Sequence, residues 1–195
     1  MSKKSWTLFL DRDGVINSSK PGLHNQNHAE FHFLSNNLSF FKNLSEVFGT
    51  ILVVTNQQGI AKGLLTVEDL NKIHHYMCAE IEKAGGHINK VYFCPEHAYL
   101  KSQCRKPNSG MALEAQTDFP DIDFCKSVMI GDSDTDIEFG KRLGMTTIWI
   151  DNGVVSDKKR AKIKSEADFL FNSLEAFAET LTLKGIDFFS KTDIF

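Results

Sequence analysis

Short, unbroken runs of apolar residues recur along this chain, and each is followed by a longer segment with the spacing of a helix. The runs cover residues 6–10, 51–54, 91–93, 128–130 and 146–150, with a further short run at 169–171. They are β-branched or aromatic and continuous rather than alternating, which indicates strands covered on both faces. Strands that alternate with helices predict an α/β fold, in which helices flank a doubly wound, mostly parallel sheet.

Helical spacing identifies the connecting segments. Helices are expected over residues 38–48, 66–84, 110–118, 134–143 and 173–183. Thr66 can cap the second of these, which has one apolar face, and its His74 and His75 are expected at the surface. The lysine-rich run 158–164 is interpreted as a solvated helical face. The polar segment 17–32 is interpreted as a long loop of the kind that often forms a lid.

Length and composition are those of one ordinary globular domain over residues 1–195, with 42% hydrophobic and 24% charged residues. No apolar run approaches the ~18 residues of a membrane helix, and the basic start lacks the apolar core of a secretory signal. We therefore expect a cytoplasmic protein with no membrane contact, and a monomer by default. A net charge of −3 argues against a broad nucleic-acid surface. The length of the chain and the lack of a secretory signal also argue against a disulfide framework for the four cysteines.

Acidic residues follow two of the predicted strands directly. Asp11 and Asp13 come after the first strand, and Asp132 and Asp136 come after the strand at 128–130. Ligands of open parallel sheets bind outside the carboxyl ends of the strands, so we expect these carboxylates to converge. Two carboxylates at the spacing of the first pair can serve as a nucleophile and as a general acid and base.

Polar and basic residues follow two further strands. Thr55, Asn56 and Gln57 come after the second strand, and Arg105 and Lys106 lie in the connection after the third. The hydroxyl and nearby backbone N–H groups can bind phosphate oxygens, and the lysine can hold the nucleophile and the phosphoryl oxygens together. Together with the carboxylates, these groups predict phosphoryl transfer.

A magnesium ion would complete such a site, because an anionic phosphate approaching a carboxylate needs its charge screened. Asp11, Asp132 and Asp136 can supply carboxylate oxygens to the ion. Asp13 can supply its backbone carbonyl. We therefore predict Mg²⁺ as the cofactor.

In this order the residues resemble the four motifs of the haloacid-dehalogenase-superfamily phosphatases, namely Asp11-x-Asp13, Thr55, Lys106 and Gly131-Asp132-x-x-x-Asp136. The resemblance is closest to the D-glycero-D-manno-heptose 1,7-bisphosphate 7-phosphatases and the related histidinol-phosphatases. It implies that Asp11 forms an aspartyl-phosphate, and that Asp13 protonates the leaving alkoxide and then activates water. It also implies that Arg105 contacts the far end of the substrate and that no large cap domain is present.

The predicted activity is therefore the Mg²⁺-dependent hydrolysis of the 7-phosphate of a heptose bisphosphate, a small phosphorylated sugar. A histidinol-phosphate phosphatase with the same mechanism is the alternative enzyme. A non-catalytic binding protein on the same fold is the alternative of another class, and the presence of every catalytic side chain argues against it. The net charge disfavours a nucleic-acid 3′-end phosphatase.

The resemblance also implies a structural zinc ion in the connection after residues 91–93, held in the family by a Cys-x-His pair and a Cys-x-Cys pair. Cys94, His97 and Cys104 match this pattern in part, but Ser102 stands where a third cysteine is expected. A closed structural zinc site needs four ligands. Two interpretations therefore remain, a degenerate zinc site at these residues or a metal-free loop with two reduced cysteines.

Overall fold

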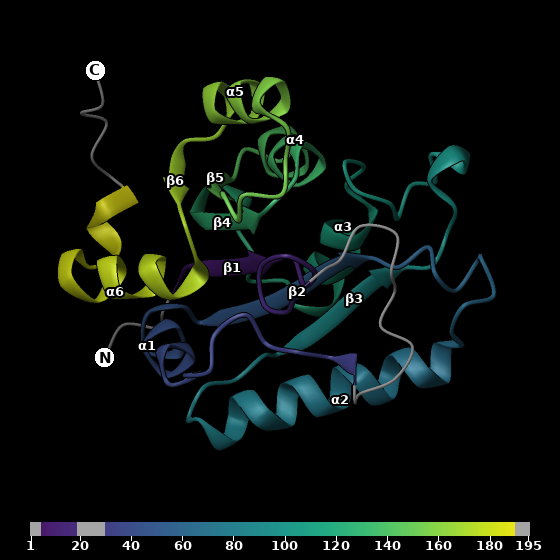
Figure 1. Ribbon diagram of the computed structural model, residues 1–195. Coiled ribbons are helices and arrows are strands. Elements are labelled where there is room, and N and C mark those ends of the chain that lie inside the picture. Colours follow the sequence, from purple (N-terminus) through teal and green to yellow (C-terminus); the bar gives the residue numbers. More distant parts are fainter. Residues whose placement is uncertain (1–4, 19–29, 190–195) are drawn as a thin grey trace.

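The computed structural model describes residues 5–18 and 30–189, and its centre is a six-stranded parallel sheet (Figure 1). The strands lie where the apolar runs predicted them, so the predicted α/β fold with a parallel sheet is confirmed. They are β1 (Thr7–Leu10), β2 (Thr50–Asn56), β3 (Lys90–Cys94), β4 (Ser127–Gly131), β5 (Thr146–Ile150) and β6 (Phe169–Phe171). Their order across the sheet is β3-β2-β1-β4-β5-β6, and every neighbouring pair is parallel.

Helices cover both faces of the sheet (Figure 1). On one face lie α1 (Phe40–Val47), α2 (Val67–Lys83) and α6 (Leu174–Lys184), and on the other lie α3 (Gly110–Asp118), α4 (Asp134–Arg142) and α5 (Asp157–Glu166). Short 3-10 turns are η2 (Ala98–Leu100), η3 (Phe124–Lys126) and η4 (Ile186–Phe189). Among the residues that the structure describes, no helix is long and apolar enough to cross a membrane.

The apolar runs are continuous because each strand is buried from both sides. Leu8 and Leu10 pack in the core under α1, α2 and α6, while Phe9 points to the core under α3 and α4. All three side chains are fully buried. Side chains alternate between the faces of a strand, so a strand with helices on both faces needs apolar residues at every position.

Local signals in the sequence fix the start of α2. Thr66 caps the helix through a capping box, in which its hydroxyl accepts the Asp69 N–H at 3.1 Å while the Asp69 carboxylate faces back towards Thr66. The basic run 158–164 is helical as expected and lies within α5. Of the predicted loop 17–32, residues 19–29 lie outside the described part. The Ser18 N–H donates to the His32 carbonyl at 2.9 Å, so the two ends of this loop are joined.

The order of the strands creates a crevice at one end of the sheet. The chain runs from β1 outward to β2 and β3, and then returns to place β4 on the other side of β1. Leu10 is paired with Val53 of β2 and with Ile130 of β4. The residue after Leu10 therefore enters the point where the strand order reverses, which is where open α/β sheets bind ligands.

Helix α4 packs unusually close to the sheet at Gly140. A Cβ atom built there would lie 2.6 Å from Thr147 Cγ2 and 2.9 Å from Met129 Cβ, closer than real side-chain contacts allow. The absence of a side chain thus sets how near the helix comes to β4 and β5. Because Asp136 lies one turn earlier in the same helix, this contact also sets the position of its carboxylate.

Candidate active site

Three elements bring charged side chains together at the carboxyl end of β1. Asp11 follows β1, and its backbone N–H donates to the carbonyl of Ile130 at 2.9 Å. The Lys106 Nζ lies 2.8 Å from Asp11 Oδ1 and 2.6 Å from Asp136 Oδ1. Lys106 is only 3% exposed and Asp136 is fully buried. A buried ammonium group thus joins two carboxylates that are 125 residues apart in the chain.

Asn56, at the end of β2, fixes the backbone of Lys106. The Lys106 N–H donates to Asn56 Oδ1 at 3.0 Å, and Asn56 Nδ2 donates to the Lys106 carbonyl at 3.2 Å. The sequence predicted that Asn56 would bind phosphate. In the structure its side-chain amide pairs with the Lys106 backbone and so supports the lysine, and its contact with phosphate stays a prediction.

The carboxylate of Asp13 is surrounded by hydrogen-bond donors. Arg12 Nη2 donates to Oδ1 at 2.9 Å and to Oδ2 at 2.8 Å, Asn17 Nδ2 donates to Oδ1 at 2.9 Å, and Gln57 Nε2 donates to Oδ2 at 2.7 Å. Burial alone would raise the pKa of Asp13, but the Arg12 charge and the hydrogen bonds from Asn17, Arg12 and Gln57 outweigh it and hold the pKa below its usual value. Asp13 is therefore held as a carboxylate.

Gln57 also connects Asp13 to Thr55. The same Nε2 group donates to Thr55 Oγ1 at 2.8 Å, while the Gln57 backbone N–H donates to the Cys94 carbonyl at 2.7 Å. Since the threonine oxygen accepts from the glutamine, its own proton can be donated to an anion in front of it. This orientation suits a hydroxyl that binds a phosphate oxygen.

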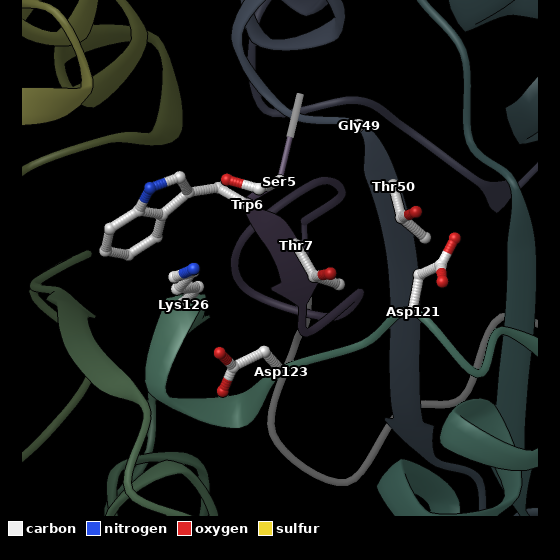
Figure 2. Close-up of a pocket in the computed structure, with 8 residues that line it drawn as sticks. All are labelled: Ser5, Trp6, Thr7, Gly49, Thr50, Asp121, Asp123 and Lys126. Atoms are coloured by element: carbon white, nitrogen blue, oxygen red, sulfur yellow. The ribbon is translucent and has the colours of Figure 1, made fainter. Parts of the chain in front are cut away.

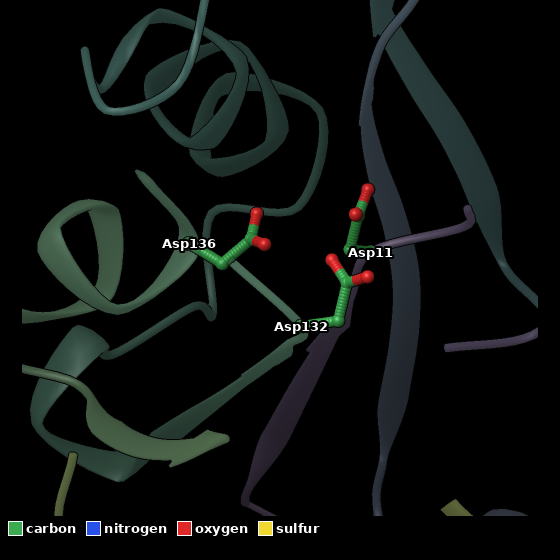
Figure 3. A group of neighbouring side chains, drawn as sticks. All are labelled: Asp11, Asp132 and Asp136. Carbon is green, nitrogen blue, oxygen red and sulfur yellow. The ribbon is translucent and has the colours of Figure 1, made fainter. Parts of the chain in front are cut away.

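Asp11, Asp132 and Asp136 form a compact group of carboxylates (Figure 3). Each offers an oxygen atom, and these atoms all lie within 4.8 Å of one another. Asn152 Nδ2 donates to Asp132 Oδ2 at 2.9 Å and so fixes one of the three. Gly14, with a φ of 88°, allows this approach, because a Cβ atom there would lie 1.9 Å from the same Asp132 oxygen.

The electrostatics of this group fit a divalent cation. Burial raises the pKa of Asp11 to about 8 against the opposing charge of Lys106, and burial together with Asp136 raises that of Asp132 to about 7. One ammonium group faces two buried carboxylates and a half-buried one, which leaves negative charge uncompensated. Oxygen atoms alone are the donor set that hard cations such as Mg²⁺ prefer. Of the four aspartates expected at the metal, Asp13 is the one whose side chain lies outside this group.

A small cleft opens in front of these residues. Its volume is about 110 Å³, close to the space of three to four water molecules at ~30 Å³ each. It is lined by Asp11, Asp13, Thr55, Asn56, Lys106, Ser133, Thr135 and Asp136. The cleft has room for a phosphoryl group, and a larger substrate has to extend beyond it.

Comparisons with known proteins agree with this geometry. Residues 103–177 match the HAD-hydrolase-like family model. The chain is 33% identical to the D-glycero-alpha-D-manno-heptose-1,7-bisphosphate 7-phosphatase of Campylobacter jejuni, over 98% of this chain and 99% of that protein. It is 37% identical to the enzyme of the same name from Mycobacterium tuberculosis, over 68% of this chain and 70% of that one.

The chain belongs to the D-glycero-D-manno-heptose-1,7-bisphosphate 7-phosphatase family. It is thus a phosphatase of the haloacid-dehalogenase superfamily, as the motifs predicted. The solved structure of D,D-heptose 1.7-bisphosphate phosphatase from B. bronchiseptica, complexed with magnesium and phosphate, superimposes with a TM-score of 0.81 at 27% identity. That match covers 92% of this chain and 99% of the other. Within residues 5–18 and 30–189 the chain forms the sheet and its flanking helices, with no large cap domain, as expected.

The loop after β3 differs from both predicted arrangements. Cys94 and Cys104 are bonded to each other in a disulfide, with their Cα atoms 5.3 Å apart. The expectation of reduced cysteines is therefore wrong, and the disulfide leaves neither thiolate available to bind zinc. The ring of His97 stacks on that of Tyr99 instead, with centroids 4.9 Å apart.

Arg105 lies beside Lys106 but does not line the small cleft. Its Nη1 donates to the Glu96 carbonyl at 3.4 Å. Burial lowers the pKa of Arg105, which leaves the guanidinium charged because its usual value is so high. The arginine is thus half-buried next to Lys106 in the chain, with its guanidinium held by the loop after β3, and its contact with substrate stays a prediction.

Sequence reasoning missed several residues that support the site. Arg12, Asn17 and Asn152 were not singled out, and His74 was wrongly placed at the surface, since it is only 6% exposed. A signal for His74 was present, because it lies four residues after Leu70 and so on the apolar face of α2. Asn152 Nδ2 also donates to the Gly14 carbonyl, 138 residues away in the chain, and no local pattern indicates such a contact.

Proposed function

We propose that this protein is a Mg²⁺-dependent phosphomonoesterase that removes the 7-phosphate of D-glycero-D-manno-heptose 1,7-bisphosphate. The observation that carries the proposal is the buried Lys106, which joins Asp11 to Asp136 at the point where the strand order reverses. The names of the relatives supply the substrate. The prediction of a cytoplasmic monomer is kept as part of the proposal.

In the first step, an oxygen of Asp11 attacks phosphorus and forms an aspartyl-phosphate. The Lys106 ammonium group, 2.8 Å from Asp11, holds the nucleophile and stabilises the negative charge of the phosphoryl oxygens. The Thr55 hydroxyl donates to another of these oxygens. Asp11, Asp132, Asp136 and the backbone carbonyl of Asp13 would hold Mg²⁺, which when bound neutralises phosphate charge.

Asp13 handles the protons in both steps. In the free protein Asp13 is a carboxylate, so it first takes up a proton from solvent as the anionic phosphoryl group arrives, because the added negative charge raises its pKa. As the bond from phosphorus to the sugar oxygen breaks, Asp13 gives this proton to that oxygen, because an alkoxide is a poor leaving group. The resulting carboxylate then takes a proton from the water that attacks the aspartyl-phosphate. Inorganic phosphate leaves, Asp13 releases this proton to solvent, and both carboxylates return to their starting states.

The body of the substrate lies outside the cleft, which holds little more than the phosphoryl group. We assign Arg105 to the far end of the substrate, since it directly precedes the cleft-lining Lys106 in the chain and a charged guanidinium suits a second phosphate or sugar hydroxyls. A bisphosphate would use both ends of this arrangement. A substrate with a cationic far end, such as histidinol phosphate, would meet an arginine there.

The test is phosphate release with Mg²⁺ and with EDTA over a panel of esters. The panel contains both anomers of heptose 1,7-bisphosphate, histidinol phosphate, fructose 1,6-bisphosphate and an aryl phosphate. We expect phosphate release with Mg²⁺ and none with EDTA. The kcat/KM for one heptose anomer should exceed that of the non-heptose esters at least ~100-fold, which corresponds to ~2.7 kcal/mol. Equal, slow hydrolysis of every ester would reject the heptose substrate. Preference for histidinol phosphate would select the alternative enzyme.

A further inference from the structure

Arg12 lies between Asp11 and Asp13 in the sequence, yet its guanidinium pairs only with Asp13. Its Nη2 contacts both oxygens of Asp13, and its Nη1 lies 3.1 Å from Nε2 of His74. The arginine is 1% exposed and does not line the cleft. It therefore lies behind Asp13, out of reach of a phosphate group, and connects Asp13 to helix α2.

His74 is the other end of this connection. Arginine can only donate, so Nε2 of His74 must accept, and the ring carries its proton on Nδ1. Burial and the adjacent Arg12 charge lower the pKa of His74 to about 3, so the ring is neutral at physiological pH. The ring packs near Phe93 of β3, with centroids 6.0 Å apart. A neutral, buried acceptor is what an inward-facing guanidinium needs.

Few other groups hold the guanidinium. Among the described residues its Nε has no hydrogen-bond partner, so the two Nη groups make its hydrogen bonds. Without His74, Nη1 would be buried and unpaired, and the group could relieve this only by moving. Any such movement carries the Asp13 carboxylate with it.

The four hydrogen bonds to Asp13 have a consequence for proton transfer. A carboxylate has about four in-plane acceptor sites, and Arg12, Asn17 and Gln57 fill them. The proton that Asp13 gives to a leaving oxygen, or a water that donates to Asp13, must therefore replace one of these donors. The amides of Asn17 and Gln57 are neutral and replaceable, whereas the arginine contributes charge and is anchored at its other end.

We propose that His74 is a positioning residue that acts through Arg12, keeping the Asp13 carboxyl group in place while an amide donor gives way to the proton that Asp13 passes to the leaving oxygen. This inference rests on the proposed role of Asp13 as general acid. It does not depend on which phosphate ester is the natural substrate. His74 itself never touches the substrate.

The test compares two leaving groups. A sugar phosphate needs a proton on its departing oxygen, whereas 2,4-dinitrophenyl phosphate releases a stable anion without one. We expect His74→Leu to lower kcat on the sugar phosphate at least ~10-fold, a part of the ~10²–10⁴-fold that general acid catalysis supplies. The burst rate of dinitrophenolate release reports the first step alone. In His74→Leu this rate should differ from wild type by less than about 3-fold, because the step needs no general acid.

Two variants of the same helix complete the experiment. His74→Gln keeps an oxygen that can accept from Arg12 and should restore most of the loss. His75→Leu removes the adjacent exposed histidine and should leave both rates unchanged. If His74→Leu fails to fold, His74→Asn carries the comparison with His74→Gln, because its shorter side chain ends farther from Arg12.

Equal losses on both leaving groups would reduce His74 to a structural residue and overturn the inference, as would unchanged rates on both. The experiment uses whichever alkyl phosphate the wild-type protein hydrolyses best. An error in the proposed substrate would therefore appear in the wild-type panel. An error in the positioning role would appear only in the comparison of the variants.

Discussion

The amino end of the sheet carries a cavity of about 720 Å³, whereas the cleft at the carboxyl end measures about 110 Å³. The larger cavity lies at the starts of β1 and β2 (Figure 2). Its lining residues are Ser5, Trp6, Thr7, Gly49, Thr50, Asp121, Asp123 and Lys126. Both regions contain aspartates and a lysine, so residue type does not tell which of them is the active site, and volume favours the wrong one.

Burial distinguishes them. At the amino end Asp121, Asp123 and Lys126 are all exposed, and Asp123 is engaged in capping the short turn η3 by accepting the Cys125 N–H at 3.0 Å. At the carboxyl end Lys106 and Asp136 are buried against each other. Burying charge costs free energy, so a protein maintains it where the charge is used. The comparison teaches that cavity size alone would have chosen the wrong end of this sheet.

The largest expected effect comes from the same substitution made at each end. Asp11→Asn removes the nucleophile and should lower kcat at least ~10³-fold, while circular dichroism shows the fold intact. Asp121→Asn, in the larger cavity, should leave kcat/KM within ~2-fold of wild type. The measurement is steady-state phosphate release with Mg²⁺. An Asp11→Asn protein with near wild-type turnover would disprove the nucleophile assignment.

A smaller effect should appear in stability. Without metal, the folded pKa values of Asp11 and Asp132, about 8 and about 7, lie above those of the unfolded chain. The folded state therefore holds protons that the unfolded chain has released above about pH 4, and this stability is lost as pH rises through 7 to 8. In EDTA the Tm should fall between pH 5 and pH 8.5 by at least ~3 °C, the shift for ~1 kcal/mol.

Mg²⁺ sharpens this second test. Because the ion binds the deprotonated carboxylates, it should raise the Tm more at pH 8.5 than at pH 5. Asp132→Asn should flatten the pH dependence in EDTA, and Asp121→Asn should leave it unchanged. A Tm in EDTA that stays level or rises over this range would contradict the electrostatic description of the carboxylate group.

The smallest effect is expected from Lys126→Met, which removes the ammonium group from the lining of the larger cavity. The side chain is exposed at the far end of the sheet from Asp11, so kcat/KM should stay within ~2-fold of wild type. The same phosphate-release measurement decides it. A change of 10-fold or more would show that the two ends are coupled, and the comparison drawn above would fail.

The sequence predicted the elements that depend on local patterns. The strand at Thr146–Ile150 was predicted with its observed bounds, because a β-branched run between turns is a strong local signal. The convergence of Asp11 with Asp132 and Asp136 followed from the rule that strands of a parallel sheet share a carboxyl end. Both inferences depend only on the order of strands and helices along the chain. Neither requires knowing where a side chain points.

The missed features depend on side-chain directions set by distant parts of the chain. Asn56 pairs with the backbone of Lys106, 50 residues away, and Arg12 turns towards His74, 62 residues away. A polar residue at the end of a strand can face a ligand or a neighbouring loop, and the sequence does not distinguish the two. The Cys94–Cys104 disulfide was missed because the expected cytoplasmic setting argued against any disulfide.

The close packing of α4 at Gly140 makes the protein's mutational tolerance uneven in a way that chemistry alone would not suggest. Any side chain at this position pushes the helix away from β4 and β5. Asp136, which lies one turn earlier in the same helix, moves with it. Position 140 should therefore tolerate substitution as poorly as a catalytic carboxylate does, although it has no functional group at all. In this fold, a position where only the hydrogen atom of glycine fits constrains the active-site geometry as strictly as the side chains that bind the phosphate.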